Sequence, residues 1–575
     1  MSKYFELGLA EETSKITPLD AAIEKHIHPK MHIYSGYLPF ALSNEIARQF
    51  RNKTPNFTIS CLGAVDNINI LIASGLVKRV IASYVGLILP SPVMSPVLQK
   101  ALDEGLEIEN WSLLTIIQRL EAAARNLPFM PTQSLKGSSI AEENENRQQY
   151  RTIVDPFTQK EFGVVKPLKP DLTIMHAYCA DPSGNAIPIL SPTEEALGAF
   201  ASRNGVILSV EKIVSVDYIR RHSFLVKVPS RIVRAVVKAP FGMHPYGCRG
   251  HEWSGYSEDA CFGRNLQIAF TEKQKMEKWL KKWVFAPKSH EDYLTKVGVG
   301  RVNALKRSAC YTTWKSQKLK KVDQIQKNPP NKTERMAIFT ANEIFDSIQK
   351  KGYDNILSGL GISHLASWIA THILRSEGIR VPLVVELGLF GLLPPPGQPF
   401  LVPIQGLEFC SMLTNTIDIL GVIANNTNML ACLSAGQVDK QGNINSTKIG
   451  RVFLFGSGGA NDVSMVAREV IVTVPHNELR LVKKVSYVTC PGSKVRKVVT
   501  DRGVLEKMHG ELTLTKIYRK KKETKREAIA AIENNMGWEP KRAKQVIILK
   551  EPQTDLVLLL RCFDPYRYFL GKLSS

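Results

Sequence analysis

The chain has 575 residues, of which 44% are hydrophobic and 22% are charged. This balance excludes a chain that is disordered throughout, collagen-like or a coiled coil, and at about 150 residues per domain the length predicts three or four compact units. The 75 Lys and Arg residues against 53 Asp and Glu residues give a net charge of +22.

The N-terminal residues lack the apolar core of a signal peptide, and their glutamates disfavour a mitochondrial presequence. No apolar run reaches about eighteen residues, so we expect no membrane span. The longest candidate, 381–397, is interrupted by Glu386 and closed by three prolines. Nine cysteines without a C-x-x-C pair predict neither a metal site nor a disulfide framework. We therefore expect a cytoplasmic protein with reduced thiols.

The first candidate site in chain order is Gly36, which follows Ser35. Its N–H group is a candidate donor to a ligand oxygen, and the alternative is a simple turn glycine. Further along, 58–64, 65–75 and 79–89 predict a strand, a helix and a strand. Glu107 and Glu109 are expected in the first turn of an amphipathic helix, where the helix dipole favours acids.

A repeated pattern then divides the chain into two halves. The apolar run 171–180 ends in Asp-Pro-Ser-Gly-Asn, and the apolar run 428–438 ends in Asp-Lys-Gln-Gly-Asn. In both turns glycine serves a positive φ, and Asp and Asn bond the backbone of the turn itself. Each pattern is followed by a β-rich run. Each pattern is also preceded by a predicted strand, a helix and a further strand. In the second half these elements are 355–362, 363–378 and 381–391.

This repetition predicts two homologous open α/β domains with mainly parallel sheets. We expect the first domain over 1–270 and the second over 333–575. The segment 271–332 is interpreted as a basic, partly helical linker. From 271 to 335 the sequence has 17 Lys or Arg and 6 Asp or Glu residues. No nucleic-acid-binding motif accompanies this charge, so we do not expect such binding, although a basic surface attracts polyanionic ligands.

The strand ends of the second half offer the best candidates for chemistry, because ligands bind beyond the carboxyl ends of parallel strands. Glu386 interrupts an apolar strand end, which favours a nucleophile or general base in a partly dry cleft. The alternative is a terminal carboxylate that reaches water or an arginine. A glycine-rich turn at 456–462 precedes a helical pattern and predicts an anion site, with a tight turn as the alternative.

These junctions resemble family I coenzyme A transferases over nearly the whole chain. The family motif Glu-x-Gly-x-x-Gly-x-x-Pro is present from Glu386 to Pro394, and Gly-x-Gly-Gly-Ala-x-Asp is present at 456–462. The first half is most similar to the α subunit of the glutaconate type, and the second half is similar to its β subunit. Leu387 stands where succinyl-CoA:3-ketoacid transferases have Asn.

The resemblance implies that Glu386 attacks an acyl-CoA and then carries CoA as a glutamyl thioester. It also implies oxyanion donors in the N–H groups of Gly388 and Gly36, and contacts to the CoA arm from a glycine loop. That loop comprises Gly456, Gly458, Gly459 and Ala460. The implied partners are an acyl-CoA and a small carboxylic acid. Coenzyme A acts as substrate, with no tightly bound cofactor and no metal, and a fused chain is compatible with a homodimer.

Two alternatives remain open from the sequence. Some members of the glutaconate type hydrolyse thioesters or open rings, and one uses a carboxylate in the first half, which keeps Glu109 as a second candidate acid. The other alternative is a non-catalytic member that binds a ligand or a protein partner.

Overall fold

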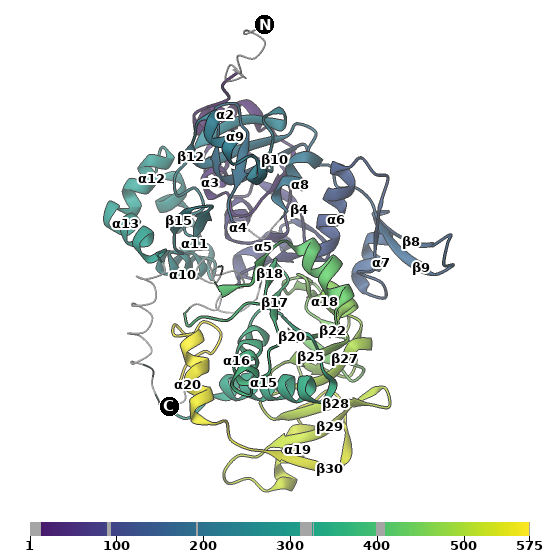
Figure 1. Ribbon diagram of the computed structural model, residues 1–575. Helices are drawn as coiled ribbons and strands as arrows, with labels where there is room; N and C mark the ends of the chain where they lie inside the picture. The colour runs from purple at the N-terminus through teal and green to yellow at the C-terminus, as the bar shows by residue number, and fades with distance from the viewer. Residues whose placement is uncertain are drawn as a thin grey trace.

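The computed structural model describes residues 13–88, 94–190, 194–310, 325, 327–397, 407 and 409–573. Figure 1 shows two lobes, one above the other, with the N-terminal half of the chain forming the upper lobe. We call the part of the described chain up to residue 310 the first lobe and the part from residue 327 the second lobe.

The first lobe is built on an eight-stranded sheet in the order β13-β12-β10-β1-β2-β4-β6, with β11 beside β10. All pairs along this order are parallel, and only β11 runs antiparallel to its neighbour. The strands are β1 (His32–Ser35), β2 (Phe57–Ser60), β4 (Val77–Ala82), β6 (Glu107–Asn110), β10 (Leu172–Ala180), β11 (Ala186–Pro188), β12 (Val206–Ile213) and β13 (Val233–Lys238). The central strand β10 is buried at every position, as expected for a parallel strand that helices cover on both faces.

Helices and small sheets complete the first lobe. The helices are α2 (Leu19–His26), α3 (Phe40–Gln49), α4 (Asp66–Ala73), α5 (Pro96–Asp103), α6 (Leu113–Ala124), α7 (Ser139–Asn146), α8 (Glu195–Ala201), α9 (Val216–Arg221), α10 (Ala260–Ala269), α11 (Lys273–Leu280), α12 (His290–Val297) and α13 (Val299–Ser308). The small sheets pair β3 (Gly63–Ala64) with β5 (Tyr84–Val85), β14 (Cys248–Gly250) with β15 (Trp253–Tyr256), and β9 (Glu161–Val165) with both β7 (Met130–Thr132) and β8 (Tyr150–Val154).

The second lobe is built on a ten-stranded sheet in the order β19-β18-β17-β16-β20-β25-β27-β28-β29-β30. Its centre, from β17 to β27, is parallel. The strands are β16 (Asn355–Ser358), β17 (Leu383–Val385), β18 (Leu389–Phe390), β19 (Met412–Leu413), β20 (Met429–Ser434), β25 (Glu469–Thr473), β27 (Val495–Val499), β28 (Gly503–Met508), β29 (Glu511–Tyr518) and β30 (Lys541–Leu549). The parallel α/β fold class predicted from the sequence is therefore confirmed in both lobes.

The remaining elements of the second lobe are helices and short strands. The helices are α15 (Lys332–Lys351), α16 (Ile362–Ser376), α17 (Ala424–Asn426), α18 (Ala460–Val466), α19 (Lys525–Glu533) and α20 (Thr554–Phe563), and a π-helical turn spans Ile417–Ile423. The short strands are β21 (Gln437–Asp439), β22 (Ile444–Asn445), β23 (Lys448–Ile449), β24 (Val452–Phe453) and β26 (Leu481–Val482).

The two Asp-x-x-Gly-Asn turns have the same hydrogen bonds. Asp181 Oδ1 accepts from the N–H of Asn185 at 2.9 Å, and Asp439 Oδ1 accepts from the N–H of Asn443 at 3.0 Å. The Asn amide then donates to the second carboxylate oxygen in each turn, at 2.8 Å and 3.0 Å. Both Asn side-chain oxygens also accept an N–H from a short helix, that of Ser230 or Gly492. Identical hydrogen bonding in the two lobes supports an internal repeat.

The sheets correct the register of that repeat. The sequence patterns align 355–362 with 58–64, but β16 lies beside β20 as β1 lies beside β10. The equivalent of Ser358 is therefore Ser35, and both hydroxyls donate to the carbonyl of the glycine that follows. The alignment of the two halves from sequence patterns is displaced by one strand-helix unit, because successive βαβ units have the same periodicity.

The basic segment departs from its interpretation as a linker. Helices α11, α12 and α13 pack on the first lobe, where Trp279, Leu280 and Tyr293 are buried in its core. The hydroxyl of Tyr293 lies 2.6 Å from His244 Nδ1, and Arg301 pairs with Asp259. The first lobe thus extends beyond the predicted boundary at 270, since apolar side chains lie between the lysines of this segment. Residues 311–324 lie outside the described part.

Candidate active site

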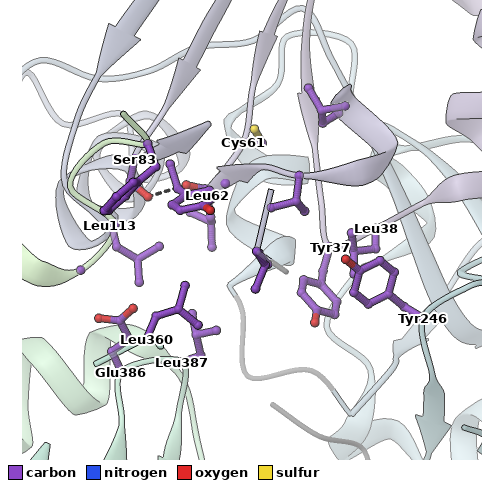
Figure 2. A pocket seen from close by; sticks show the side chains of 18 of the residues that line it. Tyr37, Leu38, Cys61, Leu62, Ser83, Leu113, Tyr246, Leu360, Glu386 and Leu387 are labelled. Atoms are coloured by element: carbon purple, nitrogen blue, oxygen red, sulfur yellow. Dashed lines mark hydrogen bonds between the residues drawn. The ribbon is translucent and has the colours of Figure 1, made fainter. Parts of the chain in front are cut away.

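A cavity of about 240 Å³ lies between the two lobes and is lined by residues of both. Figure 2 shows Glu386 with Leu360 and Leu387 at its lower edge, and Ser83 and Leu113 of the first lobe above them. Tyr37 and Tyr246 lie at the far end of the same cavity. The acid singled out in the sequence therefore lies at the seam between the lobes.

Glu386 is positioned by a tight turn between β17 and β18. The N–H of Gly388 donates to the carbonyl of Val385 at 3.0 Å, which closes the turn. Gly388 has φ 104°, a conformation that favours glycine. The turn places Glu386 and Leu387 at its tip, where both line the cavity.

The environment of Glu386 disfavours its charged form. Burial raises the pKa of Glu386 to about 8, the negative charge of Asp462 adds to the rise, and the N–H of Gly459 opposes it by donating to the carboxylate. A Cβ on Gly459 would lie only 1.9 Å from Glu386 Oε2. Glycine at 459 therefore leaves room for the carboxylate beside a backbone N–H group.

The glycine-rich turn also joins the lobes. The N–H of Gly458 donates to the carbonyl of Ser83 at 2.8 Å, and the N–H of Leu113 donates to the carbonyl of Gly458 at 3.0 Å. A Cβ on Gly456 would lie 2.4 Å from the carbonyl oxygen of Ser83. Gly458, Gly459 and Ala460 line the cavity, and Gly456 packs against the first lobe instead.

Asp462 continues this junction at the start of helix α6. Its carboxylate accepts from the hydroxyl of Ser112 at 2.6 Å and from the N–H of Leu114 at 3.0 Å. An acid of the second lobe thus caps a helix of the first, where the helix dipole favours negative charge. Burial raises the pKa of Asp462 to about 6, and hydrogen bonds from Ser112 and Ser134 oppose that rise.

Two sequence predictions about this region need correction. The N–H groups of Gly388 and Gly36 donate to the carbonyls of Val385 and Ile174, at 3.0 Å and 2.9 Å. Neither is free to serve as an oxyanion donor in this structure. Gly36 does line the cavity, and the N–H group at the carboxylate is that of Gly459. The hydrogen-bond partner of an N–H group at a strand end depends on which strand lies beside it. The sequence of one segment does not identify that neighbouring strand.

Glu109, the second candidate acid, is a buried structural partner. It lies in strand β6, as Glu107 does, and not in a first helical turn. Its Oε1 accepts from Trp111 Nε1 at 2.8 Å and pairs with Arg119 at 3.1 Å. It is absent from the cavity wall among the residues described. Because these bonds occupy its carboxylate, Glu109 has a structural role in packing.

A second buried cluster brings together residues that are far apart in sequence. Ligand atoms of His176, Glu211 and Cys248 lie within 4.8 Å of one another. Both ring nitrogens of His176 are already paired, with Ser209 and Glu211, each at 2.9 Å. The hydroxyl of Tyr256 also donates to Glu211 at 2.9 Å. The cluster forms a satisfied polar network in the first lobe.

Sequence reasoning missed most of the cavity wall. Tyr37, Tyr84 and Tyr246 come from three separate loops or strands and carry no motif. The hydroxyl of Tyr246 donates to Asp66 at 2.9 Å, and Gln267 also donates to Asp66, at 2.7 Å. Only the fold brings these positions together. In the part of the chain that the structure describes, no helix has the length and apolar character needed to cross a bilayer.

Comparison with known proteins gives consistent matches. The family model for coenzyme A transferase matches residues 16–239. One of the subunits of glutaconate CoA-transferase from Acidaminococcus fermentans is 30% identical over 314 residues, which cover 51% of this chain and 95% of that protein. One of the subunits of 3-oxoadipate CoA-transferase from Pseudomonas knackmussii is 24% identical over 306 residues, 50% of this chain and 100% of the relative.

A solved structure extends the likeness to both lobes. An acyl-CoA transferase from Escherichia coli O157:H7 aligns with 94% of this chain and 95% of its own, with a TM-score of 0.64 and 16% identity. That match shows the same fold across both lobes. The sequence match over nearly all of a glutaconate CoA-transferase subunit shows that this chain belongs to family I of the coenzyme A transferases.

Proposed function

We propose that the protein transfers CoA between an acyl-CoA and a carboxylic acid through a glutamyl-CoA thioester on Glu386. The observation that carries this proposal is the Glu386 carboxylate at the edge of the inter-lobe cavity, beside the N–H of Gly459. Covalent catalysis by a carboxylate splits one difficult exchange into two easier steps.

The proposed reaction begins when a carboxylate oxygen of Glu386 attacks the thioester carbonyl. The C–S bond breaks, giving a mixed anhydride and CoA thiolate. The thiolate attacks the glutamyl carbonyl, and the acyl group leaves as a carboxylate that keeps one oxygen from Glu386. An acceptor carboxylate then reverses these steps and leaves as the new acyl-CoA. One thioester replaces another, so coenzyme A acts as substrate.

The surroundings of Glu386 favour this role. A carboxylate whose pKa is raised is a stronger nucleophile once ionised, because solvation stabilises its charge less. The N–H of Gly459 orients the carboxylate. Gly458, Gly459 and Ala460 line the cavity and are proposed contacts of the CoA arm. No Lys or Arg is among the described lining residues, so we propose that the phosphates of CoA lie outside the cavity, near surface cations.

The decisive test is intact-protein mass spectrometry after incubation with an acyl-CoA. We expect a CoA adduct that hydroxylamine removes, that maps to Glu386 and that is absent in Glu386→Gln. Glu109→Gln is the matched control, since it removes the other candidate acid, and it should retain the adduct. An adduct that persists in Glu386→Gln would refute the proposal. Release of CoA at the same rate with and without an acceptor acid would instead favour a thioester hydrolase.

A further inference from the structure

The cavity beside Glu386 is a mostly apolar chamber. Its wall includes leucine, isoleucine, valine, methionine, phenylalanine and tyrosine side chains from both lobes. Among the described lining residues there is no Lys, Arg or His, and the ionisable carboxyl groups are those of Glu258 and Glu386.

Several polar groups of the wall are already bonded within the protein. The hydroxyl of Ser83 donates to the carbonyl of Leu62 at 2.5 Å, and that of Tyr84 donates to the carbonyl of Leu87 at 2.5 Å. The hydroxyl of Tyr246 donates to Asp66 at 2.9 Å. Asn67 donates to the hydroxyl of Ser43 at 3.2 Å. These donors would have to break hydrogen bonds to buried partners before they could bind a ligand.

From this wall we infer that the acyl groups used at Glu386 are apolar monocarboxylates, without a second carboxylate. The inference rests on the proposed function and names its substrate class. A second carboxylate in the chamber would lose its water and meet no cation among the described lining residues, a combination that strongly disfavours binding. The carboxylate of Glu386 would add repulsion when it is ionised.

The CoA arm does not alter this conclusion. The arm is common to all acyl-CoA substrates, so discrimination between them depends on the acyl group alone. Glutaconate, named in the A. fermentans relative, is a dicarboxylate. The inferred preference therefore differs from the acid in that name.

The test compares pentanoyl-CoA with glutaryl-CoA, which have the same chain length and differ by one terminal carboxylate. We expect kcat/KM to be at least about 100-fold higher for pentanoyl-CoA, the scale of discrimination reached when a buried polar group lacks a partner. Calorimetry with Glu386→Gln measures binding without chemistry, and pentanoyl-CoA should bind at least about tenfold more tightly. Equal or tighter binding of glutaryl-CoA would overturn the inference.

The two readouts separate this inference from the proposed function. If no CoA adduct forms with either substrate, the proposed function fails, and the binding ratio still decides the acyl preference. A pair of variants adds a second check at Leu62, which lines the cavity and accepts the hydrogen bond from Ser83 that is drawn in Figure 2. Leu62→Arg should narrow the preference for pentanoyl-CoA by at least about tenfold through a new ion pair, and Leu62→Gln should not. An unchanged preference in a folded Leu62→Arg variant would count against the inference.

Discussion

Replacing Gly459 by alanine is expected to disable Glu386 while leaving the fold intact. The added Cβ would lie 1.9 Å from Glu386 Oε2 and 2.6 Å from its Cδ. Non-bonded heavy atoms are comfortable at about 3.5 Å, so the carboxylate must move by more than about 1 Å. The backbone itself is not strained, because Gly459 has φ −87°, which alanine adopts readily.

The size of the effect follows from this displacement. A misplacement of about 1 Å costs on the order of 100-fold in rate, or about 2.7 kcal/mol of transition-state stabilisation. The displaced carboxylate also loses the N–H of Gly459, so its pKa rises further above the ordinary value. The free energy of unfolding should fall by less than about 1 kcal/mol, because the displaced group is the end of one side chain and alanine at a helix N-cap is less favourable than glycine by no more than that amount.

The assay is the single-turnover rate of CoA adduct formation, read by quenched-flow mass spectrometry, together with urea unfolding. Gly263→Ala is the matched control, because a Cβ there meets nothing within 4 Å. It should retain the full rate. If Gly459→Ala forms the adduct within about threefold of the wild-type rate, with unchanged stability, the placement of Glu386 against Gly459 would be wrong.

Three further predictions concern the buried carboxylates Glu386, Asp462 and Glu109. Burial raises the pKa of Glu386 to about 8, and the proposed nucleophile is its ionised form. The rate of adduct formation should therefore rise about tenfold from pH 7 to pH 9, and a flat pH profile would contradict this. Asp462→Asn removes a negative charge that raises the pKa of Glu386, so the increase in the adduct-forming rate should begin at lower pH. The variant also loses a capping acceptor, which should reduce the free energy of unfolding in urea by about 1–3 kcal/mol. Glu109→Gln removes the charge partner of the buried Arg119 and should lower the free energy of unfolding by about 3 kcal/mol. The variant should still form the CoA adduct. Loss of the adduct from a folded variant would restore Glu109 as a catalytic candidate.

Much of the architecture was predictable because it depends on local patterns. Parallel strands buried on both faces appear as continuous apolar runs, and the Asp-x-x-Gly-Asn turns bond their own backbone. The position of Glu386 was predictable for a similar reason, since an acid that ends an apolar strand is unfavourable for packing alone. These features need no knowledge of what lies across the sheet.

The wrong predictions depended on distant partners. The N–H of Gly36 bonds to the carbonyl of Ile174, far along the chain, and Glu109 of strand β6 pairs with Arg119 of helix α6. The assignment of the glycine loop to CoA stays a prediction, and the structure adds that Gly456 and Gly458 also contact Ser83 of the other lobe. A glycine-rich turn that binds a phosphate has the same sequence pattern as one that packs against another segment of backbone. Only the tertiary fold distinguishes the two.

The cap that Asp462 places on helix α6 has a consequence for biosynthesis. When a ribosome has completed the first lobe, the amide of Leu114 still awaits its acceptor, and the apolar wall has no opposing surface. Both are completed only after translation has passed residue 462. A polypeptide that ends before residue 462 would therefore lack the acceptor for Leu114 and the second-lobe part of the cavity wall, and both are completed when the two lobes dock.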